Sequence, residues 1–191
     1  MKRKAILLII TLSALLPGAI FSDNTTSRHW YVYPDIEWSY YIWSSNSNWE
    51  FQVEWAFDVW ELYTDLDFTK DSSPSAGQIW VSRGLAEDGF CPQEQGVVAC
   101  ARPFPETGEH IADADIYFET DEDWDSGNCN PDPGEAARFS LALHEMGHAA
   151  GWLDHSDEED AIMHVPIVTG ECHTLGTHDI EAMDDQYDHI H

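Results

Sequence analysis

Basic residues are scarce in this 191-residue chain, which has 8 lysines and arginines against 36 aspartates and glutamates. Three of the eight lie in residues 2–4, and Lys70 is the only lysine beyond them. The formal net charge of -28 argues against nucleic acid and anionic membranes as partners, because both would repel such a surface. Three origins of the acidity stay open: general solubility, a saline habitat in which dense carboxylates keep the surface hydrated, and calcium binding.

Long apolar runs are equally scarce. The single one, residues 5–16, follows Lys-Arg-Lys and precedes the small residue Ser22, which is the pattern of a secretory signal peptide. It is shorter than the roughly 20 residues that cross a membrane, although an uncleaved anchor is the alternative. We therefore expect residues 1–22 to be removed and the protein to be secreted. Residues 23–191 show no repeat or linker and predict one domain, with a monomer as the expected state.

The chain also lacks any CxxC pair, which argues against a cysteine metal site. Its four cysteines, an even number in an exported chain, predict two disulfides out of three possible pairings. We predict Cys91–Cys100, which closes a short loop, and Cys129–Cys172, which joins segments on either side of residues 135–151.

Sequence patterns indicate an α+β fold. Ser47 and Glu50 form a capping box, and apolar residues follow at helical spacing, so a helix is expected over 47–64. Strands are expected at 38–43, 78–82, 96–101 and 114–118, a helix from the Asp132 cap to Gly151, and a last helix over 177–187. This order predicts one twisted sheet backed by helices, in a layered α/β arrangement.

The segment HEMGHAAGWLDH, residues 144–155, is the most informative of the chain. His144 and His148 are four residues apart, so on a helix both imidazoles leave one face and can share one metal ion. Glu145 lies between them, beside any water on that metal. Gly151 is expected to end the helix by adopting a positive φ, after which the chain can bring a third ligand back. Three ligands with an open position are typical of catalytic zinc.

Two adjacent residues can supply the third ligand. Asp154 and His155 both follow closely after Gly151, where the chain can return to the metal. Both side chains suit zinc. Adjacent residues rarely point to the same place, so only one is expected to bind.

Residues 144–155 and the downstream Ala161-Ile162-Met163 resemble the metzincin zinc proteases, and within them the matrixin catalytic domain. The likeness extends to Phe57-Asp58-Val59-Trp60, to residues 112–118 with Trp124, and to the closing segment with Leu175, Asp179 and Tyr187. It implies a metzincin fold with a Met-turn at Met163, an apolar floor beneath the histidines. It also implies a secreted zinc endopeptidase in which Glu145 is the general base for a metal-activated water.

The chain departs from the matrixin pattern at several points. At the family spacing from His148 the third ligand falls on Asp154, whereas counting back from Met163 it falls on His155. The snapalysins, small bacterial metzincins with the same spacing, are similar in using the aspartate, so the resemblance slightly favours Asp154.

Cys100 and Tyr117 stand where the family has histidines of a structural zinc, so a single zinc is expected. Glu119 and Glu122 stand where it has acidic calcium ligands, so calcium is a possible second cofactor. The resemblance further implies that an extended protein substrate adds to the strand at 97–101. His164, Val165 and Pro166 are expected to wall the primed-side pocket.

The expected control of activity also departs from the matrixin pattern. Only a few residues separate the expected signal peptide from the domain, so we expect no cysteine-switch propeptide. Two other functions remain as alternatives to the endopeptidase. One is a metzincin-like binding protein without efficient catalysis, which the presence of Glu145 disfavours. The other is an extracellular metal-binding protein, suggested by 10 histidines and many carboxylates.

Overall fold

The computed structural model describes residues 29–30, 38–43, 47–74, 78–83, 98–104, 110–120, 122–127, 129–151, 154–165, 167 and 169–187. The expected signal peptide, Cys91 and Pro166 lie outside these ranges, so the predictions made for them remain predictions.

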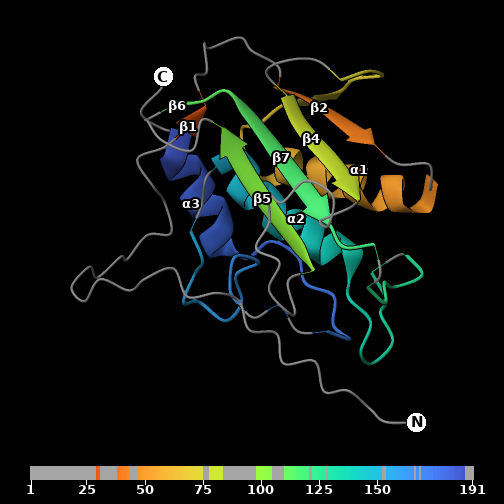
Figure 1. Cartoon of the computed structure of the whole chain (residues 1–191). Coiled ribbons are helices and arrows are strands. Elements are labelled where there is room, and N and C mark those ends of the chain that lie inside the picture. The colour runs from red at the N-terminus through yellow and green to blue at the C-terminus, as the bar shows by residue number, and fades with distance from the viewer. Residues whose placement is uncertain are drawn as a thin grey trace.

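A five-stranded, mostly parallel sheet forms the frame of the domain (Figure 1). Its order is β3 (Phe68–Lys70), β2 (Trp38–Trp43), β4 (Gln78–Arg83), β7 (Asp113–Phe118) and β5 (Ala99–Phe104). Strand β5 alone runs antiparallel, paired with β7, and forms one edge of the sheet. Two further short strands, β1 (His29–Trp30) and β6 (His110–Ile111), pair in parallel and form a separate two-stranded sheet.

Helices α1 (Ser47–Tyr63) and α2 (Arg138–Gly151) lie together on one face of the sheet, and α3 (Thr177–Tyr187) flanks α2 (Figure 1). Every residue of α2 except His148 is buried, because the helix is enclosed by the sheet, α1 and α3. Helix α1 buries one side only, with Trp49, Val53 and Trp60 in the core. The expected α+β architecture, with a mostly parallel sheet backed by helices, is therefore confirmed.

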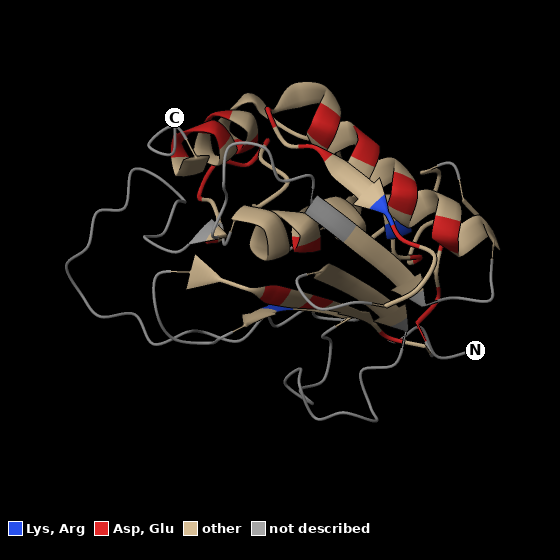
Figure 2. Ribbon diagram, turned by 90° about the horizontal axis from the view of Figure 1, so that it is seen from above, with Lys and Arg blue, Asp and Glu red and all other residues tan. Residues whose placement is uncertain are grey.

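The outward side of α1 is acidic, as the red bands in Figure 2 show. Glu50, Glu54, Asp58 and Glu61 recur along it at three- or four-residue spacing. Lys70 on β3 pairs with Glu50 and Glu54. The one lysine beyond the expected signal peptide therefore links α1 to the edge of the sheet. None of the helices in the described part of the chain is both long and apolar enough to cross a membrane.

The predicted start of the active-site helix at Asp132 is wrong. Asp132 and Glu135 do contact each other, but they form a turn at Pro133–Gly134, where Gly134 has a φ of 98°. The chain then extends, and Ala136 forms a β-bridge with Trp124. The Asp125 carboxylate accepts a hydrogen bond from the Arg138 N–H at 3.1 Å, so a residue distant in sequence caps the helix.

The edge strand is also displaced from its expected position. It was predicted at 96–101, but β5 extends from Ala99 to Phe104 and includes Pro103. Proline is tolerated there because an edge strand leaves one row of N–H groups unpaired.

Candidate metal centre

The HExxH segment occupies the last half of α2 and turns both of its histidines to one point. The Nε2 atoms of His144 and His148 lie 3.2 Å apart, and their rings meet edge to face. His155 enters from the segment beyond the helix, with its ring 5.3 Å from that of His144 and 5.0 Å from that of His148. One ligand atom from each of these three residues lies within 4.8 Å of the others.

These three imidazoles fit a zinc ion. Two tetrahedral ligands at about 2.0–2.1 Å from zinc are about 3.3 Å apart, close to the separation of the His144 and His148 nitrogens. Burial lowers the pKa of His144 to about 4, so its ring is neutral at physiological pH, as a metal ligand must be. Among the described residues this is the only cluster of three or more side chains with the spacing of a metal site.

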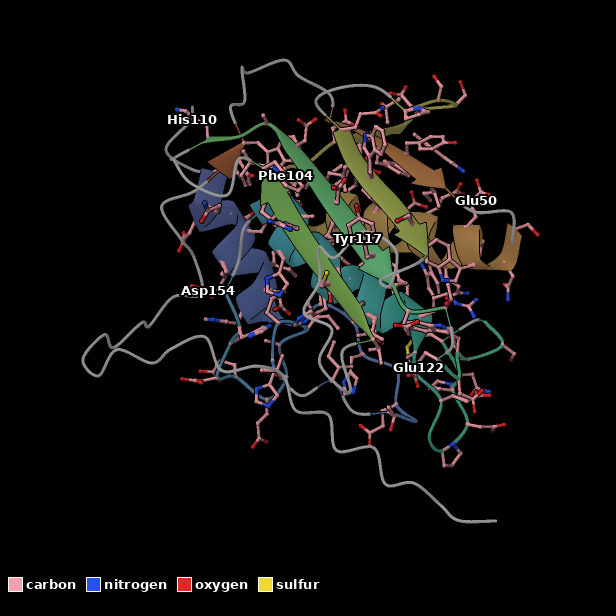
Figure 3. All side chains as sticks on the ribbon, in the orientation of Figure 1. Glu50, Phe104, His110, Tyr117, Glu122 and Asp154 are labelled. Atoms are coloured by element: carbon pink, nitrogen blue, oxygen red, sulfur yellow. A yellow bond between two sulfur atoms is a disulfide. The ribbon has the colours of Figure 1, made fainter. Side chains whose placement is uncertain are left out.

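The structure separates the two candidates for the third ligand. His155 belongs to the cluster, whereas Asp154 does not. Asp154 lies on the side of the molecule where α3 packs (Figure 3). Its carboxylate acts on His155 only as a nearby charge, which opposes the lowering of the His155 pKa by burial. The geometry therefore favours His155, against the slight preference that the resemblance gave to Asp154.

Glu145 is buried beside the metal-binding face, with 5% of its surface exposed. Desolvation raises the pKa of its carboxyl to about 8, and a hydrogen bond from the backbone of Ala101 on β5 opposes the shift. The carboxyl group of Glu145 is therefore held against the edge strand.

A second layer of contacts orients His144. Its Nδ1 lies 2.8 Å from the carbonyl oxygen of Ile162, so Nδ1–H donates there and Nε2 is left for the metal. Asp179 on α3 accepts hydrogen bonds from the N–H groups of Ile162 and Met163 at 2.7 and 3.1 Å. Met163 is fully buried and packs against Gly147 of α2, which gives the turn its place beneath the site.

Sequence reasoning missed the side chains that hold α2. The indole N–H of Trp60 donates to the carbonyl of Leu143 at 3.1 Å, and that of Trp30 to Ala149 at 2.8 Å. The hydroxyl of Tyr187 donates to the carbonyl of Ala150. The last two acceptors lie at the end of α2, where carbonyls have no partner within the helix. Tryptophan and tyrosine patterns gave no signal of these bonds, because each joins distant parts of the chain.

Helix α2 ends at Gly151 as predicted, but Gly151 does not have the expected positive φ. His164 and Val165, expected to wall a pocket, are partly buried, and the His164 Nδ1 lies 3.2 Å from the Ser156 carbonyl oxygen.

The other predicted metal ligands lie elsewhere. Glu122 lies on the opposite side of the molecule from Asp154 (Figure 3), and the Glu119 carboxylate accepts a hydrogen bond from the Thr120 N–H at 2.9 Å. Cys100 is a cross-strand neighbour of Tyr117 and is disulfide-bonded, so its sulfur is not free to bind a structural zinc.

The predicted disulfide Cys129–Cys172 is present, with its Cα atoms 5.3 Å apart. The pairing of Cys100 with Cys91 stays a prediction, since Cys91 lies outside the described residues.

A sheet backed by an HExxH helix, with a returning third histidine and a buried methionine turn below, defines the metzincin class of zinc-binding folds. Comparison with known families identifies the family within this class. The peptidase M10 family model, matrixin, matches residues 34–188, and the chain belongs to this family of metalloproteases.

Individual relatives match over shorter stretches. The chain is 47% identical over 49 residues to human matrix metalloproteinase-16, which covers 26% of this chain and 8% of the relative. The rat protein of the same name matches equally. Mouse matrix metalloproteinase-25 is 33% identical over 85 residues, which covers 44% of this chain and 13% of that protein. The chain thus matches only a small part of these relatives.

Proposed function

We propose that this protein is a secreted zinc-dependent endopeptidase that hydrolyses peptide bonds of extracellular proteins. The imidazoles of His144, His148 and His155 would hold the zinc, and Glu145 is the general base. The convergence of the three histidines on one point is the observation that carries the proposal. Membership of the matrixin family supports it.

The protein's own groups supply the proton transfers. Zinc, when bound, polarises a carbonyl and lowers the pKa of a bound water toward about 7. The Glu145 carboxylate takes the water proton and passes it to the leaving amine. Its burial keeps other water away, and the bond from Ala101 fixes its orientation against β5.

The edge position of β5 indicates how a substrate binds. Strand β7 occupies one side of β5, and in the described sheet no strand lies on the other. An extended peptide can add there by main-chain hydrogen bonds, which places its scissile bond beside Glu145. The proposal also includes the expected wall of the primed-side pocket, formed by His164, Val165 and Pro166.

Cleavage of an unstructured protein by the purified protein tests the function. We expect cleavage with one equivalent of zinc bound, and none after treatment with a zinc chelator. Glu145→Ala should keep the zinc and lose about 10²- to 10⁴-fold in rate, the typical worth of a general base. Near-normal cleavage by Glu145→Ala would contradict the assigned mechanism.

The metal stoichiometry distinguishes the alternatives. Many weak sites and no cleavage would identify an extracellular metal-binding protein instead. One tight zinc without cleavage would identify a binding protein. Dependence of stability on calcium, measured in the same preparation, tests the expected ligands Glu119 and Glu122.

A further inference from the structure

The segment that begins at the Met-turn and ends at His173 is hydrogen-bonded to α2 at both ends. At its beginning, His144 donates to the carbonyl oxygen of Ile162 at 2.8 Å. At its end, the Ser140 hydroxyl accepts a hydrogen bond from the His173 N–H at 2.7 Å and donates to the His173 carbonyl at 3.0 Å. Ser140 and His144 are one turn apart on α2, about 6 Å along the helix axis. The two ends of this segment, which we call the 162–173 loop, therefore both contact α2.

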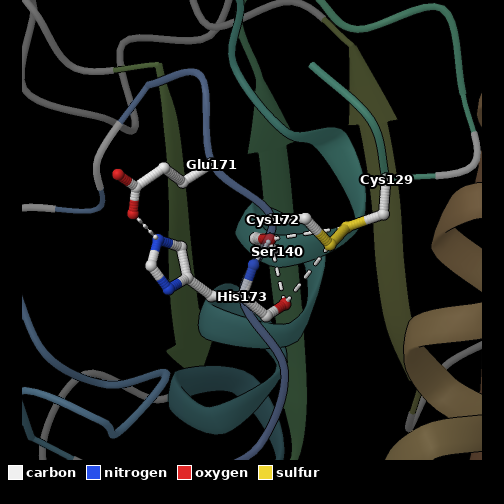
Figure 4. Close-up of polar contacts among 5 residues, drawn as sticks. All are labelled: Cys129, Ser140, Glu171, Cys172 and His173. Carbon is white, nitrogen blue, oxygen red and sulfur yellow. Dashed lines mark hydrogen bonds and ion pairs between the residues drawn. A yellow bond between two sulfur atoms is a disulfide. The ribbon is translucent and has the colours of Figure 1, made fainter.

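A disulfide strengthens the second attachment (Figure 4). Cys172 precedes His173 and is bonded to Cys129, whose sulfur lies 3.8 Å from the Ser140 oxygen. We call Ser140, the Cys129–Cys172 disulfide and the backbone of His173 the clamp. The nearby ion pair of Glu171 with the His173 ring, at 3.6 Å, is exposed and adds little.

The Ser140 hydroxyl is specialised for this contact. The residue is fully buried, and burying a hydroxyl is costly unless it is hydrogen-bonded. A serine within a helix commonly bonds to a carbonyl of the preceding turn, whereas the Ser140 bonds described above reach 33 residues along the chain. Both hydrogen bonds between this hydroxyl and backbone groups are therefore made with His173.

The clamp is linked to the metal ligand through Asp179. The Gly176 N–H, three residues after His173, donates to the Asp179 carboxylate at 2.7 Å. The same carboxylate accepts from the N–H groups of Ile162 and Met163, and the Ile162 carbonyl then accepts from His144. The end of the loop and the partner of His144 are thus held by one buried carboxylate.

We propose that Ser140 is a positioning residue: together with the Cys129–Cys172 disulfide it holds the 162–173 loop on α2 and so fixes the orientation of His144 for the metal. The proposal rests on the proposed zinc site but not on proteolysis. Loss of a partner that orients a metal ligand typically lowers metal affinity about 10- to 100-fold. Loss of the clamp should therefore loosen the Ile162 contact and weaken metal binding, although Ser140 does not touch the metal.

Metal affinity measured in Ser140→Ala tests this. Thr64→Val is the matched control, because the Thr64 hydroxyl also donates to one carbonyl and accepts from one N–H, those of Trp60 and Leu66, but at the end of α1. We expect the zinc dissociation constant of Ser140→Ala, from chelator competition, to rise by about 10-fold or more. The visible absorption of its Co²⁺ form should shift. Thr64→Val should change neither, and Ser140→Thr, which keeps the hydroxyl, should restore both toward the unmodified protein.

The double variant Cys129→Ser, Cys172→Ser removes the other half of the clamp and should weaken zinc binding in the same direction. This double variant provides the test of the clamp if Ser140→Ala does not fold. An unchanged zinc affinity and Co²⁺ spectrum in the variants that fold would overturn the clamp alone. Absence of a tight zinc site in the unmodified protein would overturn the proposed function, and the clamp with it.

Discussion

Glu145 shows how burial sets the chemistry of a single residue. Desolvation raises the pKa of its carboxyl from 4.5 to about 8 in the protein without metal. For a carboxyl whose folded pKa is raised, the destabilisation is absent below the unfolded pKa and grows as the pH rises toward the folded one. The proposed general base is therefore kept in place at a cost in stability that a neutral side chain would not have.

We predict that Glu145→Gln stabilises the metal-free protein at about pH 9 and not at about pH 4. The gain at high pH should be on the order of 5 kcal/mol at most, since a tenfold change in a protonation equilibrium corresponds to about 1.4 kcal/mol. Urea unfolding in the presence of a chelator measures it. Glu158→Gln, at an exposed carboxyl, is the control and should show no such gain. Equal stability of Glu145→Gln and the unmodified protein at high pH would refute the prediction.

The identity of the third ligand of the proposed zinc site, His155 or Asp154, also depends on single residues. We expect His155→Ala to lose more zinc affinity than Asp154→Ala, because only His155 lies in the histidine cluster. The loss should exceed the roughly 10- to 100-fold typical of an outer partner, which is the most we expect for Asp154. Zinc titration of the two variants decides, and a larger loss for Asp154→Ala would identify the carboxylate as the ligand.

Among the elements, α2 depends on close contact with the Met-turn. A Cβ atom added at Gly147 would lie 2.4 Å from the Met163 sulfur and 3.4 Å from the Trp60 ring. Glycine is therefore required here by space, between the two histidines of the proposed zinc site.

We predict that Gly147→Ala destabilises the protein by about 1–3 kcal/mol, the usual cost of overpacking a core. The double variant Gly147→Ala, Met163→Ala should lose less than the sum of the two single variants, because shortening Met163 removes the clash. Thermal unfolding of the four proteins gives the coupling. Additive losses would show that the clash is not the cause.

Predictability from sequence differs between the helices. The range of α1 was predicted closely because its apolar stripe and capping box lie within the helix itself. The start of α2 at Arg138 was not, because Asp125 caps it from 13 residues away and the bridge from Ala136 to Trp124 keeps the preceding residues extended. Helix boundaries set by tertiary contacts leave no local pattern.

For the whole molecule, the excess of acidic residues makes repulsion the dominant electrostatic effect. We predict that the unfolding temperature rises as salt increases from about 0.01 M to about 1 M, because the screening length falls from about 30 Å to about 3 Å. An uncharged osmolyte at equal osmolality is the control for general solvent effects. A flat or falling unfolding temperature would show that contacts such as those of Lys70 with Glu50 and Glu54 outweigh the repulsion.

The sequence alone determined the chemistry of the site and the class of fold. Helical spacing places His144 and His148 on one face whatever surrounds the helix, and the periodicity of α1 requires a buried side. Only the tertiary structure favours His155 over Asp154, because the position of the segment after α2 depends on contacts outside the helix, such as the Ser156–His164 bridge. The tertiary structure alone also brings Ser140 of α2 into hydrogen-bond contact with His173, in the segment before α3. Contacts between segments far apart in the chain depend on how the layers pack, and no local pattern records that packing.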